Sequence, residues 1–145
     1  MNSMEKLKAY QDAQKIVIEV KHELRQMVDA FFADCQGSWY YRDLEYDGVV
    51  TEGSMPKIIN LCVDEVIMGE GEHYTFPVPS SIIRKYLDGD KEEAAKEFQK
   101  WHKEYWEQKQ REEEEAVRRK EEALAKELEE DEYKRYLQLK EKFER

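Results

Sequence analysis

The 145-residue sequence is poor in the residues that break or cross-link a chain, with two cysteines, three prolines and six glycines. Small secreted domains often carry more cysteine, and Cys35 and Cys62 lie in neutral or apolar surroundings without a paired spacing. We therefore expect two free thiols in a reducing cytoplasm, and weigh a disulfide as the lesser alternative. Residues 1–10 lack the apolar core of a signal peptide, and no run of eighteen apolar residues occurs, so we expect no membrane association.

Motifs for catalysis, metal binding and cofactor binding are also missing. No two of the three histidines and two cysteines have a ligand spacing such as C-x-x-C or H-x-x-x-H. Cys62 and His73 could meet across neighbouring strands as nucleophile and base, but a cysteine in an apolar run is more typical of a small core residue. We therefore predict a protein that is not an enzyme and that uses no cofactor or metal.

A run of alternating acids, Asp43-x-Glu45-x-Asp47-Gly48, begins like a calcium-binding loop. Such a loop requires Glu at its twelfth position, where this chain has Ser54. Asp-Gly between two β-rich runs is also a strong hairpin signal, because a two-residue turn of this kind needs positive φ angles. The sequence therefore predicts a hairpin here, joining residues 39–46 to residues 49–52.

Residues 58–78 contain the densest run of β-branched and aromatic side chains, interrupted at Gly69-Glu70-Gly71-Glu72. This pattern predicts two more strands joined by a short acidic loop, with Pro77 marking the last strand as an edge. In the predicted strand of residues 39–46, the period of two places Tyr40, Leu44 and Tyr46 on the face that packs on a helix. Trp39, Tyr41, Asp43 and Glu45 are then expected on the opposite face.

Three helices are predicted around these strands. Residues 3–34 carry apolar residues at three- and four-residue steps, with Ser3 as N-cap. A short helix is expected at residues 81–88, and a long helix at residues 91–145, which contain no Gly or Pro. The fold class is α+β: an N-terminal helix on a small three- to four-stranded antiparallel sheet, then a short helix and a long charged helix. The expected division is a domain of residues 1–89 and a helical tail of residues 90–145, whose first turns pack on the domain.

The net charge of −10 is unevenly distributed. The segment 37–78 holds eight acids and two bases, whereas residues 91–145 hold eighteen acids and fifteen bases. An acidic sheet repels phosphates, so direct nucleic-acid binding is disfavoured, and we expect a partner with a basic surface. The expected partner-binding acids are Asp43, Glu45, Asp47, Glu52, Asp64, Glu65, Glu70 and Glu72.

Apolar residues on the long helix form separate patches between charged runs. Most patterns of this kind describe a solvated helix face with i,i+4 ion pairs, and the broken seam argues against a long heptad zipper. A shorter self-association contact, giving a homodimer through this helix, remains an alternative. The residues expected in that contact are Leu124, Leu128, Tyr136, Leu139 and Phe143. Trp106, next to basic residues, is expected to anchor a partner.

The run Tyr74-Thr75-Phe76-Pro77-Val78-Pro79-Ser80-Ser81-Ile82-Ile83, after its Gly-Glu-Gly-Glu loop, resembles a pattern in small uncharacterised acidic bacteriophage proteins. The resemblance covers roughly residues 35–83 and includes no catalytic residue. It implies a protein that acts in the host cytoplasm by binding and blocking host machinery, including defence nucleases, in an anti-CRISPR-like manner.

Two functional hypotheses follow. The first is a phage-type protein that inhibits a host nucleic-acid-binding protein, its carboxylates replacing phosphates opposite Lys and Arg. The second is a structural or assembly protein that self-associates through its long C-terminal helix. A regulator that reads DNA is a weaker third reading, because it needs a basic surface that the sequence offers only at Arg118-Arg119-Lys120.

Overall fold

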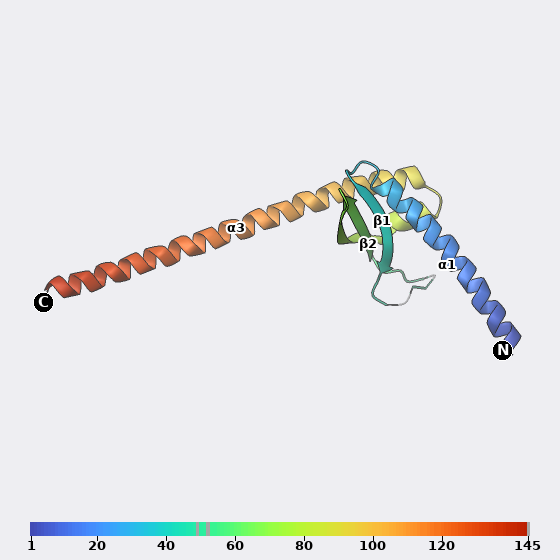
Figure 1. Cartoon of the computed structure of the whole chain (residues 1–145), viewed down its shortest axis with the longest axis horizontal. Coiled ribbons are helices and arrows are strands. Elements are labelled where there is room, and N and C mark those ends of the chain that lie inside the picture. Colours follow the sequence, from blue (N-terminus) through green and yellow to red (C-terminus); the bar gives the residue numbers. More distant parts are fainter. Residues whose placement is uncertain (49, 52, 145) are drawn as a thin grey trace. The chain divides into compact units, whose positions relative to one another are not determined.

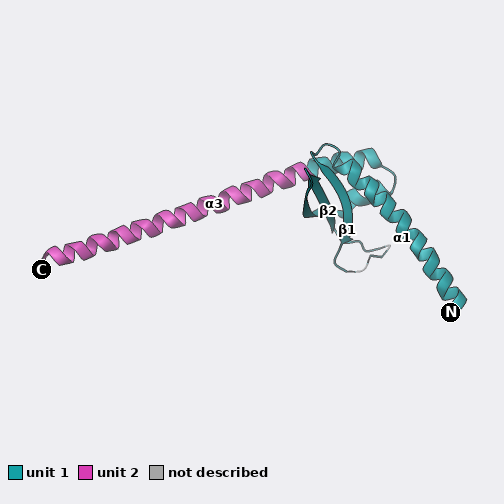
Figure 2. Cartoon of the chain, in the orientation of Figure 1, with its two compact units in different colours: residues 1–101 teal, residues 102–145 magenta. Residues whose placement is uncertain are grey.

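The structure, a computed structural model, describes residues 1–48, 50–51 and 53–144. Along the chain the elements are α1 (Ser3–Phe31), β1 (Ser38–Glu45), β2 (Ile58–Ile67), β3 (Glu70–Pro79), α2 (Ser80–Leu87) and α3 (Lys91–Glu144) (Figure 1). This is the predicted α+β class, with three strands. Two compact units, residues 1–101 and 102–145, divide the chain, so the boundary between them lies within α3 (Figure 2).

The sheet is an antiparallel meander in the order β1-β2-β3. In the central strand, Leu61 pairs with Leu44 of β1 and with Phe76 of β3. Leu61, Val63, Phe76 and Val78 are buried and share one face, because cross-strand partners point to the same side of a sheet. As predicted, β3, which contains Pro77, is an edge strand.

The predicted hairpin at Asp47-Gly48 is wrong. β1 pairs directly with β2 at seven positions, more than a four-residue strand could offer. Of the residues expected in that strand, Thr51 forms only an isolated bridge with Ser54, while Val49 and Glu52 lie outside the described residues. The tight turn lies instead between β2 and β3, at Met68-Gly69. Both of these residues have positive φ (51° and 81°), as a type I′ turn requires.

The predicted faces of β1 are right for Leu44, Asp43 and Glu45 but wrong for Trp39, Tyr40 and Tyr41, because a β-bulge separates the two groups. Tyr41 pairs with Val63 and Asp43 pairs with Cys62, so Arg42 is an extra residue between them. Trp39, Tyr41 and Leu44 therefore share the helix-covered face and are half-buried, as the paired positions indicate. Tyr40 and Tyr46, which were expected to pack on the helix, are 56% and 48% exposed.

The core of the first unit lies where α1, α2 and the first turns of α3 meet the sheet. Phe31 of α1 stacks on Phe98 of α3, with ring centroids 4.4 Å apart, and meets the edge of Tyr86 of α2 at 5.7 Å. Phe32 stacks on Trp39 of β1, also at 4.4 Å. Aromatic residues from four different elements thus pack in one cluster, which holds the sheet and the helices together.

The helix ends differ slightly from the prediction. The N-cap of α1 is Asn2, whose side chain accepts a hydrogen bond from the Glu5 amide at 2.9 Å, and α1 ends at Phe31 rather than near Asp34. Pro79 precedes the first residue of α2, Ser80. Among the described residues, no helix combines the length and the apolar composition that crossing a membrane would require.

Candidate interaction surfaces

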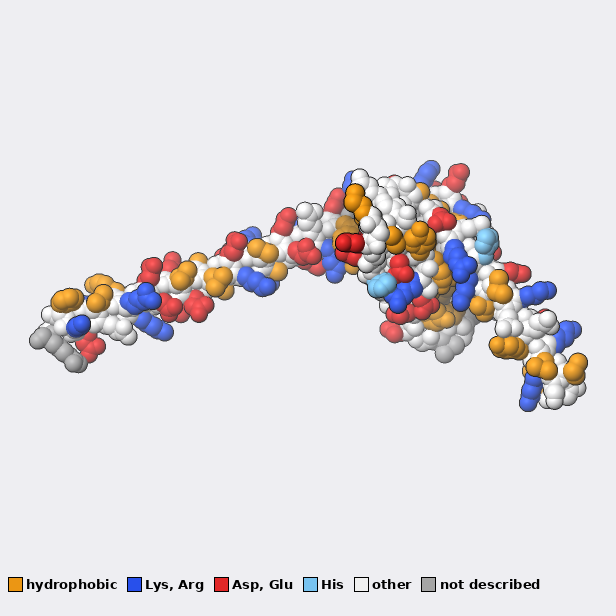
Figure 3. Space-filling model, in the orientation of Figure 1, with side chains coloured by type: hydrophobic (Ala, Val, Ile, Leu, Met, Phe, Trp, Pro, Cys, Tyr) orange, Lys and Arg blue, Asp and Glu red, His pale blue; other side chains and the backbone are white. Residues whose placement is uncertain are grey.

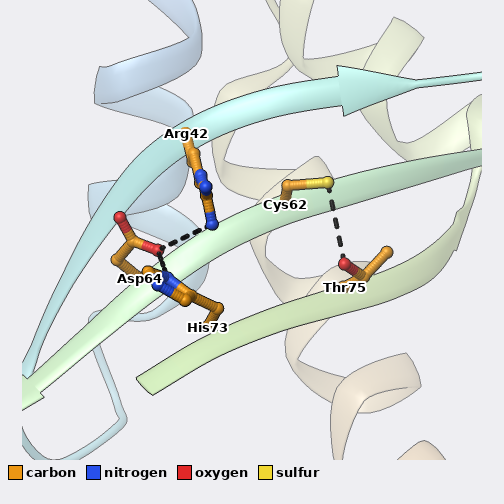
Figure 4. Close-up of polar contacts among 5 residues, drawn as sticks. All are labelled: Arg42, Cys62, Asp64, His73 and Thr75. Atoms are coloured by element: carbon orange, nitrogen blue, oxygen red, sulfur yellow. Dashed lines mark hydrogen bonds and ion pairs between the residues drawn. The ribbon is translucent and has the colours of Figure 1, made fainter. Parts of the chain in front are cut away.

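The outer face of the sheet carries a polar group centred on Asp64. Its carboxylate Oδ1 lies 3.9 Å from Arg42 Nη1 and makes a close contact with Nδ1 of His73 (Figure 4). Cys62, on the same face, directs its Sγ to Oγ1 of Thr75 at 3.7 Å. The thiol and the imidazole thus have separate partners, which is not the arrangement of a nucleophile and its base.

The expected acidic residues do not form one surface. Asp43 and Glu45 pair with Cys62 and Asn60 and so lie on the outer face with Asp64. Glu65, Glu70 and Glu72 lie on the opposite face of the sheet. Glu65 follows buried Val63 by two residues on the same strand, and it pairs with Glu72 of β3. The expectation of a single acidic face is therefore wrong, because successive side chains of a strand point to opposite faces of the sheet. Asp47 is exposed in the segment after β1, and Glu52 lies outside the described residues.

The second group of acids surrounds an open pocket at the β2–β3 turn. This pocket, of about 510 Å³, is lined by Glu65, Ile67, Met68, Glu70, Glu72 and Tyr74. The Tyr74 hydroxyl donates a hydrogen bond of 2.5 Å to Glu72 Oε2. This bond to a carboxylate holds the pKa of Tyr74 well above its usual range, so the phenol remains a donor at neutral pH.

The two cysteines are free, and Cys35 is half-buried. Burial, followed by the negative charge of Asp34, raises the pKa of Cys35 to about 11. Its Sγ donates to Asp34 Oδ1 at 3.6 Å. A thiol in this state is a weak nucleophile. Among the described residues, no group of three or more His, Cys, Asp or Glu side chains could hold a metal ion.

In the second unit, acidic and basic side chains alternate along α3 (Figure 3). Arg119 bonds Glu115 at 2.7 Å, and looser i,i+4 pairs join Arg118 to Glu122 and Lys140 to Glu144. All are exposed pairs, so each contributes little to stability, roughly 0.3–0.5 kcal/mol. These pairs support the helix locally and do not select a partner by themselves.

The residues expected to self-associate all lie on α3 with exposed side chains. Their exposed fractions run from 54% for Leu139 to 82% for Phe143. The full set is Leu124, Leu128, Tyr136, Leu139 and Phe143. Trp106 lies on the same helix and is 41% exposed, while its Nε1 donates to Nε2 of His102 at 2.8 Å.

A further exposed apolar surface was missed at the sequence level. The sequence predicts a helix over residues 3–34 that packs on the sheet, yet every residue from 3 to 23 is exposed, and burial begins only at Leu24. Periodicity identifies the apolar face of a helix but not how far along its length that face is covered. The exposed members include Leu7, Tyr10, Ile16, Val17, Ile18 and Val20.

No protein-family model matches the chain, and comparisons with curated proteins and with solved structures find no match.

Proposed function

We propose that this chain is a non-enzymatic assembly protein that self-associates through α3. One observation carries the proposal: the large apolar side chains of α3 beyond residue 106, including Leu128 and Leu139, are all exposed. Burying one Leu side chain is worth about 1.5–3 kcal/mol, so pairing two such helices gives a substantial driving force. Most helical stability in proteins comes from packing of an apolar face, which adds a reason for α3 to acquire a partner.

The test is the absolute mass of the purified protein by light scattering, at low and at moderate salt. We expect a dimer or a higher assembly, and a monomer near 17.5 kDa at all accessible concentrations would overturn the proposal. The double substitution Leu128→Glu/Leu139→Glu should dissociate the assembly, because it places charges in the buried contact.

A matched control adds the same two charges elsewhere on the same helix. Ala116 and Ala123 are exposed and lie away from the face that carries Leu128 and Leu139, as their spacing in a helix requires. Ala116→Glu/Ala123→Glu should leave the mass unchanged. Dissociation by both double variants alike would point to net charge rather than to an apolar contact.

A second candidate function is the binding and inhibition of a basic, nucleic-acid-binding host protein by a phage-type protein in the host cytoplasm. The supporting observation is that Glu65, Glu70 and Glu72 gather around one pocket, and no ion pair between described residues involves them. Carboxylates held this way can take the place of phosphates opposite Lys and Arg.

This candidate predicts binding to a basic protein that weakens steeply as salt increases. Glu65→Gln/Glu70→Gln/Glu72→Gln should abolish such binding, whereas Asp43→Asn/Glu45→Gln, on the other face of the sheet, should retain it. Affinity that does not change with salt would contradict mimicry.

A further inference from the structure

Four apolar residues of α3 recur at intervals of eleven residues: Trp106, Val117, Leu128 and Leu139. Their exposed fractions are 41%, 54%, 63% and 54%. Eleven residues make about three helical turns, so all four lie along one line of the helix. This period explains why the seam looks broken when it is compared with a seven-residue repeat.

Between these residues, the same line of α3 is completed by residues at steps of four, three and four, which add up to an eleven-residue repeat. From Val117 the line passes through Glu121 and Leu124 to Leu128, and then through Glu132 and Arg135 to Leu139. Phe143 extends it by one more turn. All of these side chains are exposed, so the line is available to a partner helix.

The pattern has a centre at Leu128, with an apolar residue eleven positions away on either side. In an antiparallel pair of helices centred there, Leu128 meets Leu128 of the second copy, and Val117 meets Leu139 of the second copy. The same alignment places Glu121 opposite Arg135 of the second copy, and two-fold symmetry repeats each of these contacts.

Charge distinguishes this alignment from a parallel one. In a parallel, in-register pair, Glu121, Glu132 and Arg135 would each face their own copy, which gives three layers of like charge near the seam. In the antiparallel pair, Glu121 faces Arg135, and Glu132 faces the apolar Leu124. The charges on α3 therefore complement a second copy in the antiparallel direction.

We propose that two copies of this chain pair through α3 in antiparallel orientation about Leu128, in a nearly straight contact with an eleven-residue repeat. This inference rests on the proposed self-association and specifies its partner, direction and register. An eleven-residue repeat favours a straight or slightly right-handed pair over the left-handed supercoil of a heptad zipper.

Disulfide trapping in a Cys35→Ala/Cys62→Ala background tests the direction. Mixing the single variants Val117→Cys and Leu139→Cys should give a cross-linked dimer under mild oxidation, because these positions meet in the antiparallel pair. Val117→Cys alone should not cross-link, since its two copies would lie roughly 33 Å apart along the pair. As a matched control, Ala123→Cys mixed with Leu139→Cys should stay uncross-linked, because Ala123 lies away from the seam.

The outcomes separate the two proposals. A monomer by light scattering removes both of them. A dimer in which Val117→Cys chains cross-link to each other, and in which the mixture gives no cross-link between a Val117→Cys and a Leu139→Cys chain, keeps self-association but overturns the antiparallel arrangement.

Charge reversal provides a second test in the native background, which does not depend on removing the cysteines. Glu121→Arg should raise the dimer dissociation constant at least tenfold, because the new positive charge would face Arg135 of the second copy. Adding Arg135→Glu to it should restore most of the affinity. In a parallel pair, the single change would replace one like-charge layer by another and have little effect, a result that would overturn the proposal.

Discussion

The ring of Phe31 in α1 lies flat against the ring of Phe98 in α3, with an interplanar angle of 10°, and both side chains are fully buried. This contact joins the C-terminal half of the first helix to the opening turns of the last one. Phe98→Ala should lower the free energy of unfolding by about 3–5 kcal/mol, since it leaves a cavity beside Phe31. Urea unfolding would measure this loss, and Phe98→Leu should retain part of the stability.

The bulge in β1 predicts opposite results for two adjacent aromatic residues. Trp39 stacks on Phe32, so Trp39→Ala should cost about 3 kcal/mol. Tyr40 is mostly exposed, and Tyr40→Ala should change the stability by no more than about 0.5 kcal/mol. Equal losses from the two substitutions in urea unfolding would contradict the observed faces of the strand.

Met68 occupies a position in the β2–β3 turn that suits Asn or Gly better. Its φ is 51° and its side chain is fully exposed, so it bears left-handed strain without gaining contacts. Met68→Asn should raise the free energy of unfolding by about 0.5–1 kcal/mol, because Asn tolerates this conformation. Met68→Leu keeps the strain and should show no gain when the two are compared by thermal unfolding.

Gly37 is held in a conformation and a space that admit no side chain. Its φ is 85°, and an added Cβ would lie 2.8 Å from Cγ1 of Ile67. Gly37→Ala should therefore destabilise the fold by more than the roughly 1–2 kcal/mol of left-handed strain alone. Combining it with Ile67→Ala should recover the part due to the clash. Gly48→Ala, at a similar φ in open space, serves as the control for strain without a clash.

The raised pKa of Cys35 predicts its reactivity and a pH effect on stability. Because the pKa is about 11 in the folded chain against an ordinary value of 9.0, alkylation of Cys35 by iodoacetamide should accelerate up to about pH 11. The protonated thiol favours the folded state, so its contribution to stability is complete below pH 9 and declines as the pH rises towards 11. Asp34→Asn should shift the alkylation profile to lower pH.

Most elements of the fold could be predicted from local signals. The periodicity of α1, the absence of Gly and Pro from α3 and the β-rich run at residues 58–78 each describe one element by its own residues. The pairing of β1 could not be predicted in this way, because Asp47-Gly48 has the chemistry of a hairpin turn. Whether β1 pairs with the residues just after that turn or with the long β2 strand depends on contacts between residues distant in sequence.

The candidate surfaces were predicted less completely for a similar reason. Glu65 and Asp64 are neighbours in sequence but lie on opposite faces, so a count of acids overestimates the charge that one partner could meet. The exposed start of α1 could not be foreseen either, because the same apolar pattern describes a covered helix and an uncovered one. The apolar residues of α3, in contrast, were placed correctly on a single helix.

The extra residue in β1 has a consequence for the tolerance of the gene to deletions. Removing Arg42 would join Tyr41 to Asp43 and leave every other pairing with β2 in place, at the loss of the contact with Asp64. Removing Tyr40 or Leu44 instead would turn part of the strand over and expose its apolar side chains. Among single-codon deletions in this strand, the loss of codon 42 should therefore be the one most compatible with folding.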